Sequence, residues 1–99
     1  MWLFVWLHNQ MEFEWSEMKR LTVLKQRGLD FLRARMLFDG RPLSTYSSPR
    51  EDELRWVSIG HLDGHMVAVI WTLRGDNIRI ITMRRARDAE KRRFSALYG

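Results

Sequence analysis

Residues 56–83 read WVSIGHLDGHMVAVIWTLRGDNIRIITM, which is three apolar runs separated by two short turn sequences. The runs are rich in Val, Ile, Trp and Thr, residues that favour strands, and they span Trp56 to Leu62, Met66 to Leu73 and Ile78 to Met83. Asp63-Gly64 fits a type I′ turn, which needs positive φ at both central residues, and a Gly-Asp-Asn sequence separates the next two runs. The pattern predicts a three-stranded antiparallel meander.

Helical periodicity precedes this meander. Ser16 is a good N-cap, apolar residues follow at threefold spacing, and Gly28 can adopt the left-handed conformation that ends a helix. This predicts a helix from about Glu17 to Arg27. Asp30 can cap a second short helix that points Phe31, Ala34 and Phe38 inward and stops at a Gly- and Pro-containing sequence.

The segments on either side of the meander complete the predicted fold. After Arg84 the periodicity is helical again, with a thin apolar stripe among basic residues. Leu43 to Tyr46 and Glu12 to Trp15 are weaker strand candidates. We therefore expect an α+β protein with an antiparallel sheet, formed by the meander plus one or two short strands, together with two N-terminal helices and one C-terminal helix.

The alternation of side chains along the last strand predicts which residues share a face. Period-two alternation places Ile78, Ile80, Thr82 and Arg84 on one face, and Arg79, Ile81 and Met83 on the other. Arg79 and Arg84 are thus expected to start on opposite faces, although sheet twist could bring Arg84 toward a common groove.

Length and composition predict one domain. The chain has 99 residues, 45% of them hydrophobic and none of them cysteine, which excludes disulfides, thiolate metal sites and a cysteine nucleophile and fits the cytoplasm. The apolar start is far shorter than the roughly 18 residues that span a bilayer, so we expect no membrane segment. Residues 1–10 are interpreted as an N-terminal extension, and residues 11–99 as the single domain.

The positive charge is regional. Met1 to Leu73 contain nine Lys or Arg and nine Asp or Glu, whereas the rest of the chain has eight Lys or Arg and three acids, and so holds the whole net charge of +5. The cluster is Arg74, Arg79, Arg84, Arg85, Arg87, Lys91, Arg92 and Arg93. Because guanidinium groups stay charged and bind phosphate bidentately, this clustering indicates a nucleic-acid surface. Taken singly, each arginine is better explained as a solvated surface position, and it is the clustering that favours nucleic acid.

Glu90 and the histidines are the titratable candidates. Glu90 lies among basic residues, where it can act as an acid or base or simply form helix-surface ion pairs. His61 and His65 flank Asp63-Gly64, but they lack the ligand number of a zinc site, so no metal site is predicted. His65 remains an alternative general base because its ordinary pKa is near neutrality.

Short sequence segments that follow one another in a fixed order resemble the BrnT family of toxins, from about Glu12 to Phe94. The matching pieces are Glu12-Phe13-Glu14-Trp15, Lys19, Gly28, Phe31, Phe38-Asp39, Ile59-Gly60, Val69 to Thr72, Arg74-Gly75, Ile78-Arg79-Ile80-Ile81, Arg84, Ala86 and Glu90. The resemblance implies a ribonuclease toxin of a type II toxin-antitoxin pair, related in fold to the RelE group. It also implies an RNA substrate and a BrnA-like antitoxin that binds operator DNA, in a hetero-oligomer with the toxin.

The resemblance gives residue-level expectations. Carried over to this chain, it implies Arg74, Arg79, Arg84 and Glu90 as catalytic residues of a metal-independent endoribonuclease without cofactors. Further RNA contacts are expected from Lys19, Arg27, Arg85, Arg87 and Arg93.

The chain departs from the family at Gln26-Arg27, where Lys-His is usual. Arginine is a poor base because guanidinium stays protonated. This departure supports an alternative, a catalytically degenerate toxin-like protein or a small nucleic-acid-binding module that acts through its antitoxin partner.

Overall fold

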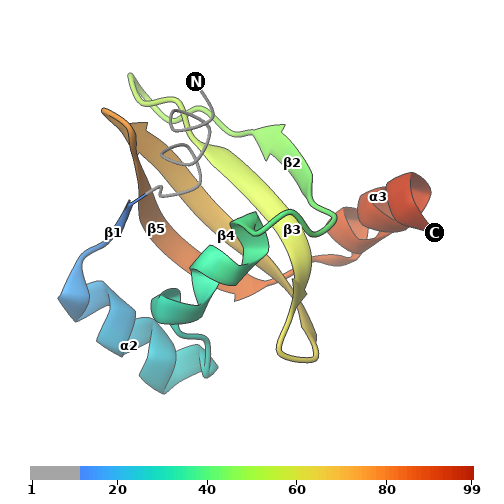
Figure 1. Ribbon diagram of the computed structural model, residues 1–99, viewed down its shortest axis with the longest axis horizontal. Helices are drawn as coiled ribbons and strands as arrows, with labels where there is room; N and C mark the ends of the chain where they lie inside the picture. Colours follow the sequence, from blue (N-terminus) through green and yellow to red (C-terminus); the bar gives the residue numbers. More distant parts are fainter. Residues whose placement is uncertain (1–11) are drawn as a thin grey trace, which may run out of the picture.

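The computed structural model describes residues 12–99, so the predicted extension at residues 1–10 lies outside the described part. A single sheet with helices on both faces forms the fold (Figure 1). The elements are β1 Phe13–Glu14, α2 Glu17–Arg27, the 3-10 helix η1 Phe31–Phe38, β2 Ser44–Ser47, β3 Trp56–Leu62, β4 His65–Arg74, β5 Asn77–Arg85 and α3 Asp88–Tyr98.

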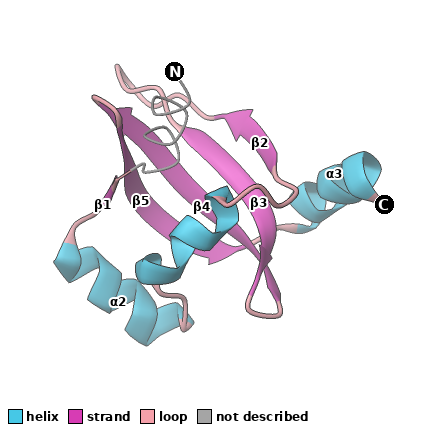
Figure 2. Ribbon diagram, viewed as in Figure 1, coloured by secondary structure: helices cyan, strands magenta, loops and turns pink. Residues whose placement is uncertain are grey.

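The sheet has five strands in the order β1-β5-β4-β3-β2 (Figure 2). The predicted meander is confirmed as β3, β4 and β5, and Asp63 and Gly64 both have positive φ, at 50° and 84°, as the turn requires. Both weaker strand candidates are present as β1 and β2. The expectation of a purely antiparallel sheet is wrong, because β1 pairs with β5 in parallel. Since α2, η1 and three strands separate these partners in sequence, local turn signals could not indicate their direction.

Helix α2 begins and ends as predicted. The Ser16 side chain accepts a hydrogen bond from the Lys19 backbone N–H, and Gly28 closes the helix with φ of 71°.

We expect Gly28→Ala to lower the free energy of unfolding by about 1 kcal/mol, because a Cβ disfavours the left-handed conformation. Chemical denaturation followed by circular dichroism measures this. Gly28→Asn is the matched variant, since asparagine tolerates this conformation better. Equal stability of Gly28→Ala and wild type would contradict the assigned cap.

The second predicted helix is a 3-10 helix, not an α-helix. Its buried residues are Phe31, Ala34 and Leu37, at a spacing of three, whereas the sequence predicted Phe38 in place of Leu37. A helix with three residues per turn places all three on one line, which an α-helix does not. Phe38 is half-buried and packs at the margin of the same core.

Two apolar cores lie on opposite faces of the sheet. Residues of α2 and η1 cover one face, with Phe31, Leu37 and Met83 among the most buried side chains. On the other face, Phe94 of α3 packs on Val57 and Ile59 of β3. Helix α3 packs on β2 and β3, and Ala68 of β4 is buried in the same core, whereas the part of this face around Ile70, Thr82 and Arg84 stays partly uncovered. Among residues 12–99, no helix is long and apolar enough to cross a membrane.

Candidate nucleic-acid interface

A β-bulge in β5 decides where its arginines point. Ile70 pairs with Thr82 and the next residue, Trp71, pairs with Ile80, so Ile81 is the extra residue. The bulge shifts the alternation by one. Ile78, Ile80 and Met83 are therefore all buried in the core beneath α2 and η1.

This shift brings Arg79 and Arg84 to the same face of the sheet. Arg79 pairs with Thr72 and Arg84 with Ala68, and both partners lie on the face that α3 partly covers. The expectation that period-two alternation separates the two arginines is wrong, and Thr82 also lies on the opposite face from Ile78 and Ile80. The physical reason is the single inserted residue, which an alternation pattern does not include.

The uncovered part of this face contains a groove of about 390 Å³. Five of its lining residues are cations, contributed by α2, the β2–β3 loop, β5 and the start of α3, and none is an acid. The lining residues are Lys19, Tyr46, Ser48, Pro49, Arg50, Arg55, Val57, Ile70, Ile81, Thr82, Arg84 and Arg87. A surface of this charge can hold a polyanion from several sides.

Arg84 is held in a fixed orientation by Glu90. Its two terminal nitrogens each donate to one carboxylate oxygen of Glu90, at 2.8 Å and 2.8 Å. The same carboxylate accepts from the Tyr46 hydroxyl at 2.5 Å and from the Arg87 backbone N–H at 2.8 Å. Glu90 is nearly buried, with 7% of its side chain exposed, while Arg84 keeps 20% exposed at the groove. One terminal nitrogen of Arg84 also donates to the Arg85 carbonyl at 3.2 Å, so the Nε–H group and one N–H of the other terminal nitrogen have no partner within residues 12–99.

The electrostatics of this network favour an orienting role for Glu90. Hydrogen bonds from Arg84, opposed by burial, lower the pKa of Glu90 to about 2. The pKa of Tyr46 is raised, first by burial and then by its hydrogen bond to Glu90. A carboxylate with a pKa of about 2 is a weak base near neutral pH, so the geometry argues against the predicted proton transfer by Glu90.

Helix α2 presents Lys19 and Arg27 along the edge of β5. Lys19 lines the groove, and Val23, one turn further on, is buried in the core. Arg27 donates to the Met83 carbonyl at 2.6 Å and lies 3.4 Å from the Thr82 hydroxyl. These positions are four residues apart and therefore share one helix face. Arg27 consequently ties α2 to β5 beside the groove.

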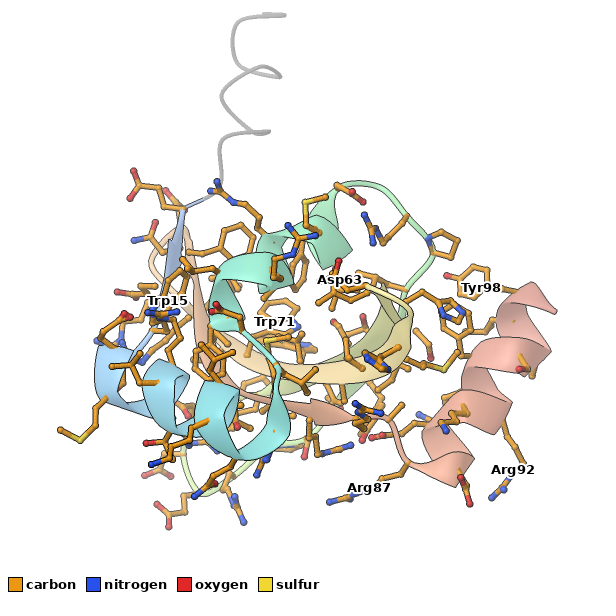
Figure 3. All side chains as sticks on the ribbon, turned by 90° about the horizontal axis from the view of Figure 1, so that it is seen from below. Trp15, Asp63, Trp71, Arg87, Arg92 and Tyr98 are labelled. Carbon is orange, nitrogen blue, oxygen red and sulfur yellow. The ribbon has the colours of Figure 1, made fainter. Side chains whose placement is uncertain are left out.

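The remaining predicted residues are not gathered in one place. Arg79 is half-buried on the groove face but does not line the cavity, and Arg74 is exposed at the far end of β4. Arg85 pairs with Val67 and so starts on the opposite face. Arg93 lies over the Tyr46 ring, with its guanidinium carbon 5.1 Å from the ring centre. Arg87, in contrast, lines the groove, and its side chain extends away from the start of α3 (Figure 3).

Tyr46, Arg50 and Arg55 line the groove but were not predicted from the sequence as site residues. Arg50 and Arg55 lie in a segment where three neighbouring acids cancel their charge in a regional count. Arg55 pairs with Glu53 at 2.6 Å, and Arg50 and Glu53 exchange two backbone hydrogen bonds of 2.9 Å. The groove therefore includes a structured loop that charge counting alone did not indicate.

His61 and His65 lie away from the groove. His65 pairs with Leu62, on the face covered by α2 and η1, so it does not face Arg84. This geometry disfavours its alternative role as the base. His61 packs edge-on against Phe94 at 5.3 Å. Within residues 12–99, no group of three or more potential ligand side chains is placed to hold a metal ion.

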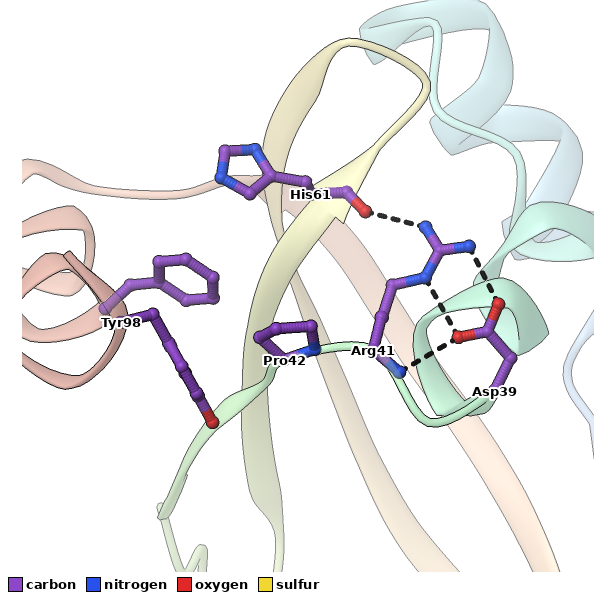
Figure 4. Close-up of a pocket in the computed structure, with 6 residues that line it drawn as sticks. Asp39, Arg41, Pro42, His61 and Tyr98 are labelled. Carbon is purple, nitrogen blue, oxygen red and sulfur yellow. Dashed lines mark hydrogen bonds and ion pairs between the residues drawn. The ribbon is translucent and has the colours of Figure 1, made fainter.

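A second cavity, of about 510 Å³, lies between the end of α3 and the segment before β2 (Figure 4). Its one arginine, Arg41, is bound to Asp39 at 2.8 Å and to the His61 carbonyl at 3.0 Å. The Tyr98 hydroxyl donates to the Leu43 carbonyl. Asp39 and Arg41 both line this cavity, so their charges cancel there, whereas no acid lines the groove.

Comparison with known protein families matches the sequence of this chain to one of them. The family of ribonuclease toxins named BrnT, of type II toxin-antitoxin systems, matches residues 15–90. The chain belongs to the BrnT family. The matched span of this BrnT protein includes Lys19, Arg84 and Glu90 and ends before Arg93. Membership implies a ribonuclease toxin with an antitoxin partner. A search of curated proteins found no match to the chain.

Proposed function

We propose that this BrnT protein cleaves RNA in the groove without a metal ion, and that Arg84 holds the phosphate that is attacked. The observation that carries the proposal is the Arg84 guanidinium at the margin of a groove with five cations, held by Glu90, which also accepts a hydrogen bond from Tyr46. A preoriented cation needs no reorganisation when charge develops on the phosphate oxygens, which is the condition for strong electrostatic catalysis.

The reaction uses the RNA's own 2′-hydroxyl as the nucleophile. Its oxygen forms a bond to the adjacent phosphorus, the bond from phosphorus to the 5′-oxygen breaks, and one proton passes overall from the 2′-hydroxyl to the leaving 5′-oxygen. Arg84 stabilises the additional negative charge, while Lys19, Arg87, Arg50 and Arg55 hold neighbouring phosphates. Arg79 and Arg74 extend the basic face toward the β4–β5 turn.

In the cell, the proposed activity inhibits growth in the cytoplasm until an antitoxin binds. We propose a BrnA-like antitoxin that binds operator DNA and forms a hetero-oligomer with this chain. The alternative, a protein that binds RNA without cutting it, is supported by Arg27, whose guanidinium binds the Met83 carbonyl and cannot act as a base.

Cleavage of RNA by the purified protein is expected to continue in the presence of EDTA, because every charge in the proposed mechanism comes from a side chain. Incubation of total RNA with the protein, followed by gel electrophoresis, measures this. Loss of cleavage in EDTA that returns on adding Mg²⁺ would refute metal independence. Binding of RNA without cleavage in any buffer would favour the alternative.

A further inference from the structure

The floor of the groove is apolar, in contrast to its margin. Val57 and Ile70 are direct partners on β3 and β4, and Ile81 is the bulged residue of β5. Val57 is buried, but Ile70 and Ile81 are only half-buried and line the cavity. The bulge is responsible for this arrangement, because it inserts Ile81 without a partner beside the Ile70–Thr82 pair.

The cations lie on both sides of this floor. Arg84 on β5, Arg87 at the start of α3 and Lys19 on α2 lie toward the β5 side of the groove. Arg50 and Arg55, in the loop that joins β2 and β3, flank the other side. The central strand β4, with Ile70, lies between the two groups. A ligand that reaches both groups therefore passes over the apolar floor.

The apolar surface of the floor indicates which part of a ligand binds there. A phosphodiester backbone alone would leave Ile70 and Ile81 in contact with water, whereas a flat nucleobase removes that apolar surface from water. The cavity volume of about 390 Å³ is in the range of sites for small organic groups. The hydroxyl groups of Thr82 and Ser48 also line the cavity and can hydrogen-bond to base edges.

We propose that the groove binds single-stranded RNA with one unstacked nucleobase on the Val57–Ile70–Ile81 floor, and that the two cation groups hold the phosphates on either side of that nucleotide. This rests on the proposed function and adds the class of substrate to it. A base inside a duplex is stacked and paired, so it reaches the floor only after an energetic cost that a single strand avoids.

The test uses trinucleotides in which fluorine replaces every 2′-hydroxyl, so that binding is measured without cleavage. One trinucleotide has a central base, and the other has an abasic central position. We expect the wild-type protein to bind the abasic trinucleotide roughly tenfold more weakly, because the base contact is lost. A duplex of the same sequence, extended to a length that stays paired, is expected to bind more weakly than the corresponding single strand.

Ile81→Ala is the matched variant. It is expected to weaken binding of the trinucleotide with a central base roughly fivefold and to leave binding of the abasic trinucleotide unchanged. Leu73→Ala, an exposed apolar residue of β4 outside the cavity, is the control and should change neither. Circular dichroism verifies that each variant is folded.

Equal wild-type affinity for the two trinucleotides, or an equal effect of Ile81→Ala on both, would overturn the base site while leaving the phosphate site intact. If the protein binds neither of the trinucleotides and does not bind a longer single strand, the proposed function itself is refuted, and the base site with it. The two failures are therefore distinguishable.

Discussion

Arg84→Ala is expected to lower the rate of RNA cleavage by roughly 100- to 1,000-fold and to abolish growth inhibition in cells. Arg84 is the cation that Glu90 orients through two hydrogen bonds of 2.8 Å, so its loss removes the charge that is best placed to stabilise the transition state. Cleavage of a fluorescent RNA under single-turnover conditions measures the effect on the chemical step.

Two variants separate a catalytic effect from a structural one. Arg84→Lys keeps the charge but cannot contact both oxygens of Glu90, so we expect a smaller loss of rate than with alanine. Arg92→Ala removes an exposed cation of α3 that does not line the groove, and it should cleave at the wild-type rate. Wild-type cleavage by a folded Arg84→Ala protein would remove Arg84 from the site.

Glu90→Gln is expected to lower the free energy of unfolding at pH 7 by about 3 kcal/mol, because it removes a buried charge from beneath Arg84. In the folded protein the pKa of Glu90 is about 2, below its ordinary value of 4.5, so folding favours the ionised form. This stabilisation is fully present above pH 4.5 and is lost as the pH falls toward 2. Urea unfolding at a series of pH values between 2 and 7 measures it.

The variant should therefore show a weaker dependence of stability on pH between 4.5 and 2 than the wild type. Asp76→Asn changes an exposed acid in the β4–β5 turn and is the control, expected to keep the wild-type pH profile. Glu90→Gln is also expected to slow RNA cleavage, since Arg84 loses the partner that orients it. A pH profile and stability equal to the wild type would show that the Glu90 carboxylate does not hold Arg84.

Features that depend on neighbouring residues could be predicted from the sequence. The Asp63-Gly64 turn fixed the pairing of β3 with β4, and Ser16 and Gly28 marked the ends of α2, because each signal acts within a few residues. The second helix was predicted, but Phe38 was expected to point inward in place of Leu37, because the spacing of three in a 3-10 helix was not considered. The parallel pairing of β1 could not be predicted, since it depends on how α2 and η1 pack.

The candidate site was predicted only in part, for a related reason. Arg84 and Lys19 line the groove and Glu90 binds Arg84 from beneath, but the position of Arg84 depends on the bulge at Ile81. A bulge inserts one residue without any distinctive sequence, so the alternation of apolar residues predicted the wrong face for Arg84. Arg50 and Arg55 were not predicted as site residues, because the position of their loop at the groove depends on the fold and not on the order of residues in the sequence.

The proposed function depends on contact between Arg84 and the RNA backbone in the groove. The most direct test is nuclear magnetic resonance of the arginine side-chain N–H groups during titration with the single-stranded 2′-fluoro trinucleotide. We expect the Arg84 Nε–H signal to shift in step with binding, while the signals of Arg33 and Arg92 stay in place. Saturated binding that leaves the Arg84 signal unchanged would contradict it.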